Sequence, residues 1–191
     1  MKMRLLAVVV FLLTGMQTLL AGDADVQTRP RPAVDPCKLI SAADIKRVQH
    51  TVLKETKPSL MSSSSAMSMR QCFYRTESHV DSISLLIAES SKDQPHAARE
   101  YWDATLVKAS ETEIKPPPSG EMTKADAKKQ RHKPERIPGL GDQAWWVGDR
   151  ATGALYVLSG DRFFRISIGG KLEDDKKTRM KALAAVVLKK L

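Results

Sequence analysis

The stretch from Gly139 to Gly170 constrains the fold most, because short apolar runs alternate there with turn residues. Gly160 and Asp161 separate two such runs, and a Gly-Asp pair flanked by β-branched and aromatic residues predicts a tight hairpin. Residues of the second run alternate between two faces of a strand: Phe164, Ile166 and Ile168 on one, Phe163, Arg165 and Ser167 on the other. With a third strand at 144–147, the stretch predicts an antiparallel sheet whose apolar face needs a cover.

The last segment, residues 171–191, is the expected cover. Its apolar residues recur at helical spacing: Met180, Leu183, Ala184, Val187, Leu188 and Leu191. The opposite face carries Lys177, Lys181 and Lys189, as a solvated helix face would. We therefore expect a helix that packs its apolar stripe on the hairpin sheet.

The amino-terminal end predicts export. Lys2 and Arg4 precede the apolar run Leu5–Leu13, and Ala21 offers a small residue for processing, so residues 1–21 are interpreted as a signal peptide. The alternative is an uncleaved anchor, since Leu5–Ala21 is just long enough to span a bilayer. Residues 22–36 carry three prolines and are expected to form a disordered tether. The expected location is periplasmic or secreted, with no stable transmembrane span after processing.

The chain contains two cysteines, Cys37 and Cys72. In an exported chain two cysteines most simply form one disulfide, and the alternative is a pair of free thiols. A redox role would favour a Cys-x-x-Cys motif, which the sequence lacks. We expect a structural bridge.

Other patterns complete an α+β fold over residues 37–191. Ser41 and Asp44 resemble a capping box, so a helix should begin near Ala42. Residues 72–75 and 80–88 predict a second strand pair, and a helix should follow Pro95. Low complexity predicts a surface loop at 54–71. The expected architecture is an antiparallel sheet of about five to six strands covered by helices, in two layers, with one disulfide.

A basic stretch interrupts this domain at about residues 110–136. Its cations include Lys124, Lys128, Lys129, Arg131 and Lys133. Such a run is either a patch that binds anions or a solvated, flexible loop, and charge runs are usually the latter. Nucleic acid is not expected as a partner of an exported chain with few aromatic residues.

No reactive centre is visible in the sequence. The four histidines form no His-x-x-x-His motif, and no Gly-x-Ser-x-Gly elbow occurs, so no metal, cofactor or catalytic residue is assigned. Trp145 and Trp146 should point to opposite faces of a strand, one into the core and one outward, where an aromatic residue could bind a partner.

Several of these motifs occur together in a known family. DPCKLIS before a short helix, the second cysteine in CFYR, and IPGLGDQAWW before the LYVLSGDRFFRISI hairpin resemble the DUF3558 family of exported bacterial (lipo)proteins of unknown function. The resemblance implies a Cys37–Cys72 bridge and an architecture similar to the extracytoplasmic sensor domain of some mycobacterial Ser/Thr kinases. It implies no catalytic residues. The chain departs from the family in lacking a lipidated cysteine and in its basic insertion.

Three functions follow from these observations. The first is an extracytoplasmic, non-enzymatic domain that binds an envelope protein or a small ligand through its sheet face or near Trp145 and Trp146. The second is attachment to an anionic lipid or polysaccharide surface through the basic stretch. The third is a hydrolase whose site is assembled from distant residues.

Overall fold

The computed structural model describes residues 33–111, 134–148, 152–170 and 174–191. The leader, most of the tether and the basic residues from Lys124 to Lys133 lie outside the described residues, so the expectations for them are not addressed by the structure. In the described part, no helix is both long and apolar enough to cross a bilayer.

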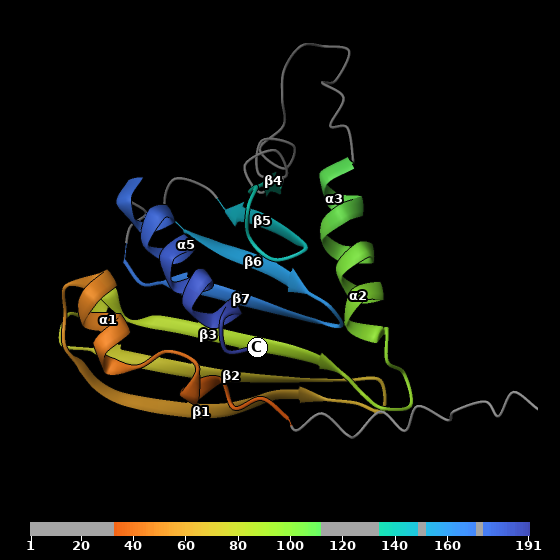
Figure 1. Cartoon of the computed structure of the whole chain (residues 1–191), viewed down its shortest axis with the longest axis horizontal. Helices are drawn as coiled ribbons and strands as arrows, with labels where there is room; N and C mark the ends of the chain where they lie inside the picture. Colours follow the sequence, from red (N-terminus) through yellow and green to blue (C-terminus); the bar gives the residue numbers. More distant parts are fainter. Residues whose placement is uncertain (1–32, 112–133, 149–151, 171–173) are drawn as a thin grey trace, which may run out of the picture. The chain divides into compact units, whose positions relative to one another are not determined.

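The described fold is built on one antiparallel sheet of seven strands in the order β1-β2-β3-β7-β6-β5-β4 (Figure 1). The strands are β1 (Leu53–Ser63), β2 (Met67–Thr76), β3 (Ile83–Ser90), β4 (Glu135–Arg136), β5 (Gln143–Gly148), β6 (Gly153–Ser159) and β7 (Arg162–Ile168). Two meanders, β1 to β3 and β4 to β7, join where β7 pairs with β3. The predicted count of five to six strands is wrong, because the two edge strands β1 and β4 leave little pattern in the sequence.

Strand β1, together with the start of β2, replaces the surface loop predicted at residues 54–71. It pairs with β2 along nearly its whole length, and both of its faces are largely exposed, with Leu60 at 65% and Met61 at 55%. A strand that buries neither face does not need to alternate apolar and polar residues. The sequence of β1 therefore lacks the two-residue period by which strands are predicted. Lys57 and Pro58 lie mid-strand, and both residue types discourage further pairing at a sheet edge.

Helices lie on both faces of the sheet. Helices α1 (Ala42–Gln49) and α5 (Asp174–Leu188) contact each other, and α5 lies over β6 and β7 (Figure 1). The segment formed by α2 (Ala97–Trp102), the π turn η3 (Asp103–Val107) and α3 (Lys108–Glu111) packs on the opposite face. The α+β class is confirmed, but the expected two-layer arrangement is not.

The face under α1 and α5, here called the first face, carries the main core. Strand residues that are at most 1% exposed line it: Cys72, Tyr74, Ile83, Leu85, Ile87, Val157, Phe164 and Ile166. From α5, Met180, Leu183, Ala184 and Val187 are fully buried against them. This confirms the final helix as the cover of the hairpin sheet.

The hairpin itself forms as predicted. Strands β6 and β7 pair up to Ser159 and Arg162, which leaves Gly160 and Asp161 as a two-residue turn. Gly160 has φ of 59°, and glycine at the first turn position suits the twist of a hairpin.

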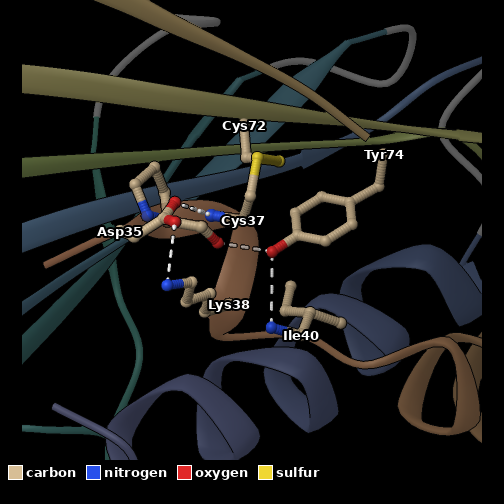
Figure 2. The surroundings of a disulfide bond; sticks show 7 residues. Asp35, Cys37, Lys38, Ile40, Cys72 and Tyr74 are labelled. Atoms are coloured by element: carbon tan, nitrogen blue, oxygen red, sulfur yellow. Dashed lines mark hydrogen bonds and ion pairs between the residues drawn. A yellow bond between two sulfur atoms is a disulfide. The ribbon is translucent and has the colours of Figure 1, made fainter. Parts of the chain in front are cut away.

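The disulfide between Cys37 and Cys72 is present and fastens the short helix η1 (Pro36–Lys38) to β2 (Figure 2). Beside it, the Tyr74 hydroxyl donates to the Pro36 carbonyl and accepts a bond from the Ile40 N–H. Burial raises the pKa of Tyr74 above its ordinary value, so this hydroxyl remains a donor. The predicted bridge is therefore one part of a joint that holds the amino-terminal segment on the sheet.

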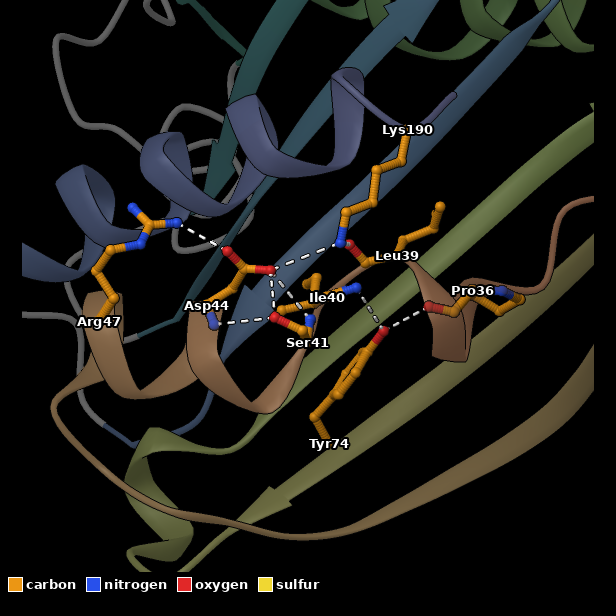
Figure 3. A network of polar contacts seen from close by, with 8 residues as sticks. All are labelled: Pro36, Leu39, Ile40, Ser41, Asp44, Arg47, Tyr74 and Lys190. Atoms are coloured by element: carbon orange, nitrogen blue, oxygen red, sulfur yellow. Dashed lines mark hydrogen bonds and ion pairs between the residues drawn. The ribbon is translucent and has the colours of Figure 1, made fainter.

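Helix α1 begins at the predicted capping box (Figure 3). The Asp44 N–H donates to the Ser41 hydroxyl at 3.1 Å, and the Ser41 N–H donates to the Asp44 carboxylate at 3.2 Å. Two helix-start N–H groups are satisfied in this way.

The ordered domain begins before the predicted boundary at residue 37. The Val34 N–H donates to Glu89 at 3.0 Å, and Arg70 donates to the Val34 carbonyl at 3.0 Å. Glu89 also pairs with Arg162 at 2.9 Å, and Arg162 donates to the Leu191 carbonyl at 3.3 Å. One carboxylate on β3 thus connects the amino-terminal segment to the last residue of the chain.

Candidate functional site

Among the described residues, the second face of the sheet is covered at one end only. There, Ala98, Trp102 and Leu106 pack on three strand residues, Ala88, Leu158 and Phe163, all of which are at most 3% exposed. The three helical residues are spaced by four, and the π turn at 103–107 allows this spacing to stay on one side of the helix. Beyond them the strand side chains of this face become partly exposed.

The Gly-Leu-Gly-Asp motif holds α2 at that end. The Asp142 carboxylate accepts bonds from the Gly160 N–H at 2.9 Å and from Arg99 of α2 at 3.1 Å. Trp102 of α2 donates to Gln143 at 3.1 Å. Gly141 has φ of 55°, and a Cβ there would lie 2.3 Å from the Leu158 carbonyl oxygen. The motif and the residue after it therefore hold α2 against the β6–β7 turn.

The uncovered part of the second face, here called the open face, spans five strands in two cross-strand rows. The first row, from β2 to β5, is Gln71, Leu86, Arg165, Tyr156 and Trp145. The second row, from β2 to β7, is Phe73, Ser84 and Ser167. Phe73 is 37% exposed and the other seven are partly buried. The same strands therefore have a sealed first face and an accessible second face.

A hollow of about 370 Å³ opens where the strands of the open face end. Tyr156, Arg165 and Ser167 line it, together with the ends of β5 and β6 and the Gly169-Gly170 pair after β7. This volume is within the range of sites that hold small organic molecules.

Arg165 is the central residue of this site. It lies on β7, the fourth of seven strands, between Leu86 and Tyr156. Its Nε is buried and has no hydrogen-bond partner in the described structure, and its terminal nitrogens also lack partners but are not shut off from solvent. A guanidinium stays charged at all physiological pH values, and a partly buried charge without a counter-ion is unfavourable for the fold.

The other polar groups of the open face also lack partners. The hydroxyls of Tyr156, Ser84 and Ser167 form no hydrogen bond among the described residues, yet solvent reaches them. The Trp145 Nε1–H is buried and has no partner in the part of the chain that the structure describes. The eight open-face residues include no carboxylate, so the site offers mainly donors and one positive charge.

The two tryptophans do lie on opposite faces. Trp146 is 6% exposed, packs in the core of the first face, and has the Lys177 Nζ 5.5 Å from its ring centroid. Trp145 lies on the open face but is only partly exposed, packed beside the residues under α2. The structure therefore brings one of the two predicted contact residues into the candidate site.

One group of Ser, His and Asp side chains lies together in the described part, but its hydrogen bonds are not those of a catalytic triad. Ser90, His96 and Asp161 meet near the β6–β7 turn, with His96 Nδ1 3.4 Å from the Asp161 carboxylate. The Ser90 hydroxyl instead donates to the Asp161 carbonyl at 3.2 Å and accepts from the Ala98 N–H at 2.9 Å. Among the described ranges, no group of three or more His, Cys, Asp or Glu side chains could hold a metal ion.

Comparisons with known proteins add no relative. No family model, curated protein or solved structure matches this chain. The resemblance to the DUF3558 family thus stays an expectation, and the open face has to be interpreted from its own chemistry.

Sequence reasoning placed Arg165 on the side of β7 opposite the core but did not single it out. The signal was present, because Arg165 is the only charged residue within the run from Phe163 to Ile168. Recognising it as a site residue required knowing that β7 is the central strand and that α2 stops short of it.

Proposed function

We propose that this chain is an exported, non-enzymatic binding domain that holds a small ligand or a segment of an envelope protein on its open face. The observation that supports this most is Arg165, a charged side chain in the middle of the sheet without a partner among the described residues. A core built only for stability would cover such a group or replace it, since an unpaired polar group costs about 1–3 kcal/mol when buried.

The surroundings of Arg165 suit binding. Trp145, Tyr156 and Phe73 offer aromatic surface, and a few polar donors lie between them. Concave sites for small molecules typically combine these two features. The disulfide supports the export part of the proposal, because such bridges persist mainly in oxidising compartments.

The test compares the two adjacent tryptophans. Trp146→Ala removes a core side chain and should lower the melting temperature markedly, by the equivalent of about 3–5 kcal/mol. Trp145→Ala should retain most of the stability but weaken binding of 2-naphthamide, an uncharged aromatic probe, followed by backbone NMR shifts at residues of β3, β6 and β7. If both variants only destabilise, or if the probe shifts no amide of the open face at millimolar concentration, the proposal is wrong.

A further inference from the structure

We infer that Arg165 is a carboxylate-binding subsite, so that the occupant of the open face carries a carboxylate next to an aromatic or apolar body. This inference rests on the proposed function and names the ligand class of the same site.

A ligand in the hollow can reach the guanidinium of Arg165. Arg165 lines the 370 Å³ hollow, and its terminal nitrogens are open to solvent while its Nε is not. A planar carboxylate can therefore approach the terminal nitrogens from the hollow and accept two parallel N–H bonds.

Two hydroxyl groups lie near Arg165 on the open face. Tyr156 lies beside Arg165 on β6, and Ser167 lies two residues along β7 on the same face. Their hydroxyls have no partners in the described structure and can donate to an acceptor held by the guanidinium. No open-face residue would repel an anion, because none of the eight is acidic.

The charge of the site suits a carboxylate better than a phosphate. A phosphate monoester carries a charge of about −1.5 to −2 near neutral pH, whereas a carboxylate carries one negative charge. The other cation in the same row, Arg136, pairs with Trp145 on β4, three strands away from β7, which is about 14 Å. Lys57 and Arg75, the cations of β1 and β2 on this side of the sheet, both pair with Glu55. Among the described residues, Arg165 is therefore the one cation left at the site, and it balances a carboxylate but would leave a phosphate undercompensated.

Apolar surface for the body of the ligand lies on both sides of Arg165. Leu86 and Phe73 continue the open face toward β2, and Trp145 and Tyr156 continue it toward β5. An aromatic or branched apolar body can pack on either side while its carboxylate stays over Arg165. The buried Nε–H of Arg165 gives a spectroscopic signal for this event, since shielding from water slows its exchange.

The experiment titrates the purified, oxidised protein with 2-naphthoate and with 2-naphthamide, which share a body and differ in charge. Calorimetry measures affinity, and NMR follows the Arg165 Nε–H and the backbone amides. We expect naphthoate to bind roughly tenfold or more tightly than naphthamide, because a hydrogen bond to a charged group contributes about 1.5–3 kcal/mol. Arg165→Gln should remove this preference without lowering the melting temperature, and Arg165→Lys should keep only part of it.

A matched control and three outcomes make the result decisive. Arg47→Gln removes an exposed arginine of α1, on the first-face side, and should leave the preference unchanged. If both probes bind the open face equally and Arg165→Gln changes neither, the carboxylate subsite is wrong while the binding function stands. If naphthyl phosphate binds more tightly than naphthoate, the carboxylate assignment is wrong. If no probe shifts the open face, the binding function itself is wrong.

Discussion

The Lys190 ammonium lies 3.6 Å from the Asp44 carboxylate, so the end of the chain reaches the capping residue of the first helix. Lys190 also donates to the Leu39 carbonyl at 2.8 Å (Figure 3). Asp44 in turn accepts bonds from Ser41 and from Arg47, the latter at 2.8 Å. This carboxylate thus joins α1 to the residues that follow α5, and the two helices also contact each other directly.

We expect the Asp44 carboxylate to make the free energy of unfolding depend on pH in the acid range. The Ser41 hydroxyl, and then Arg47 and Lys190, lower the pKa of Asp44 from 3.8 to about 2 although partial burial opposes the shift. A pKa that is lower in the folded than in the unfolded state stabilises the fold above about pH 4, and that contribution disappears as the pH falls through about 2. We expect Asp44 to contribute about 1–2 kcal/mol near neutral pH, after allowance for its partial exposure.

Urea unfolding at several pH values measures this contribution. Asp44→Asn should lower the free energy of unfolding near neutral pH and flatten its fall between about pH 4 and about pH 2. Asp103→Asn, at an exposed position on η3, is the control and should retain the pH profile of the native chain. An unchanged profile in Asp44→Asn would contradict the assignment.

The Cys37–Cys72 bridge should contribute to stability through the unfolded state. It closes a loop over a sequence separation of 35 residues, for which chain entropy predicts about 3–4 kcal/mol. The double variant Cys37→Ala, Cys72→Ala should unfold at correspondingly lower urea concentration, and a reductant should shift only the native chain. Equal midpoints for the native chain with and without reductant would show that the bridge is not stabilising.

What the sequence predicted correctly depends on local patterns. The Gly160-Asp161 hairpin, the Ser41 cap and the last helix each carry their signal within a few neighbouring residues. Strand β1 was missed because an edge strand exposed on both faces has no apolar period. In the sequence Arg165 resembles an ordinary outward-facing residue. Only the tertiary structure shows that the described helices leave its side of β7 uncovered and that it lines a hollow there.

Glu89 should be one of the most sensitive polar positions in the fold. Its side chain is 11% exposed and binds Arg162, whose side chain is 8% exposed, as well as the Val34 N–H. Glu89→Gln removes the charge facing a buried guanidinium, and breaking such a pair costs about 3 kcal/mol. Hydrogen exchange should increase at Val34 at the same time, because Gln keeps only one acceptor oxygen for the groups that the two carboxylate oxygens of Glu89 bind.

An exposed ion pair provides the control for Glu89. Glu55 pairs with Arg75 at 3.0 Å, and both side chains are about 40% exposed. Glu55→Gln should leave the unfolding midpoint close to that of the native chain, because solvent-exposed pairs contribute little. If Glu89→Gln and Glu55→Gln lower the free energy of unfolding by similar amounts, Glu89 contributes no more than an exposed ion pair does.

Replacement by phenylalanine should lower the free energy of unfolding more at Trp146 than at Trp145. Trp146 fills the space left by Gly153, where a Cβ would lie 1.9 Å from the ring, so Trp146→Phe should leave a cavity and cost about 1–2 kcal/mol. Trp145→Phe removes a buried N–H that has no partner among the described residues, and relief of that cost should offset the lost ring contact. Thermal unfolding of both variants measures the difference. A larger loss for Trp145→Phe than for Trp146→Phe would mean that the Trp145 N–H is satisfied in solution and that this end of the open face is closed.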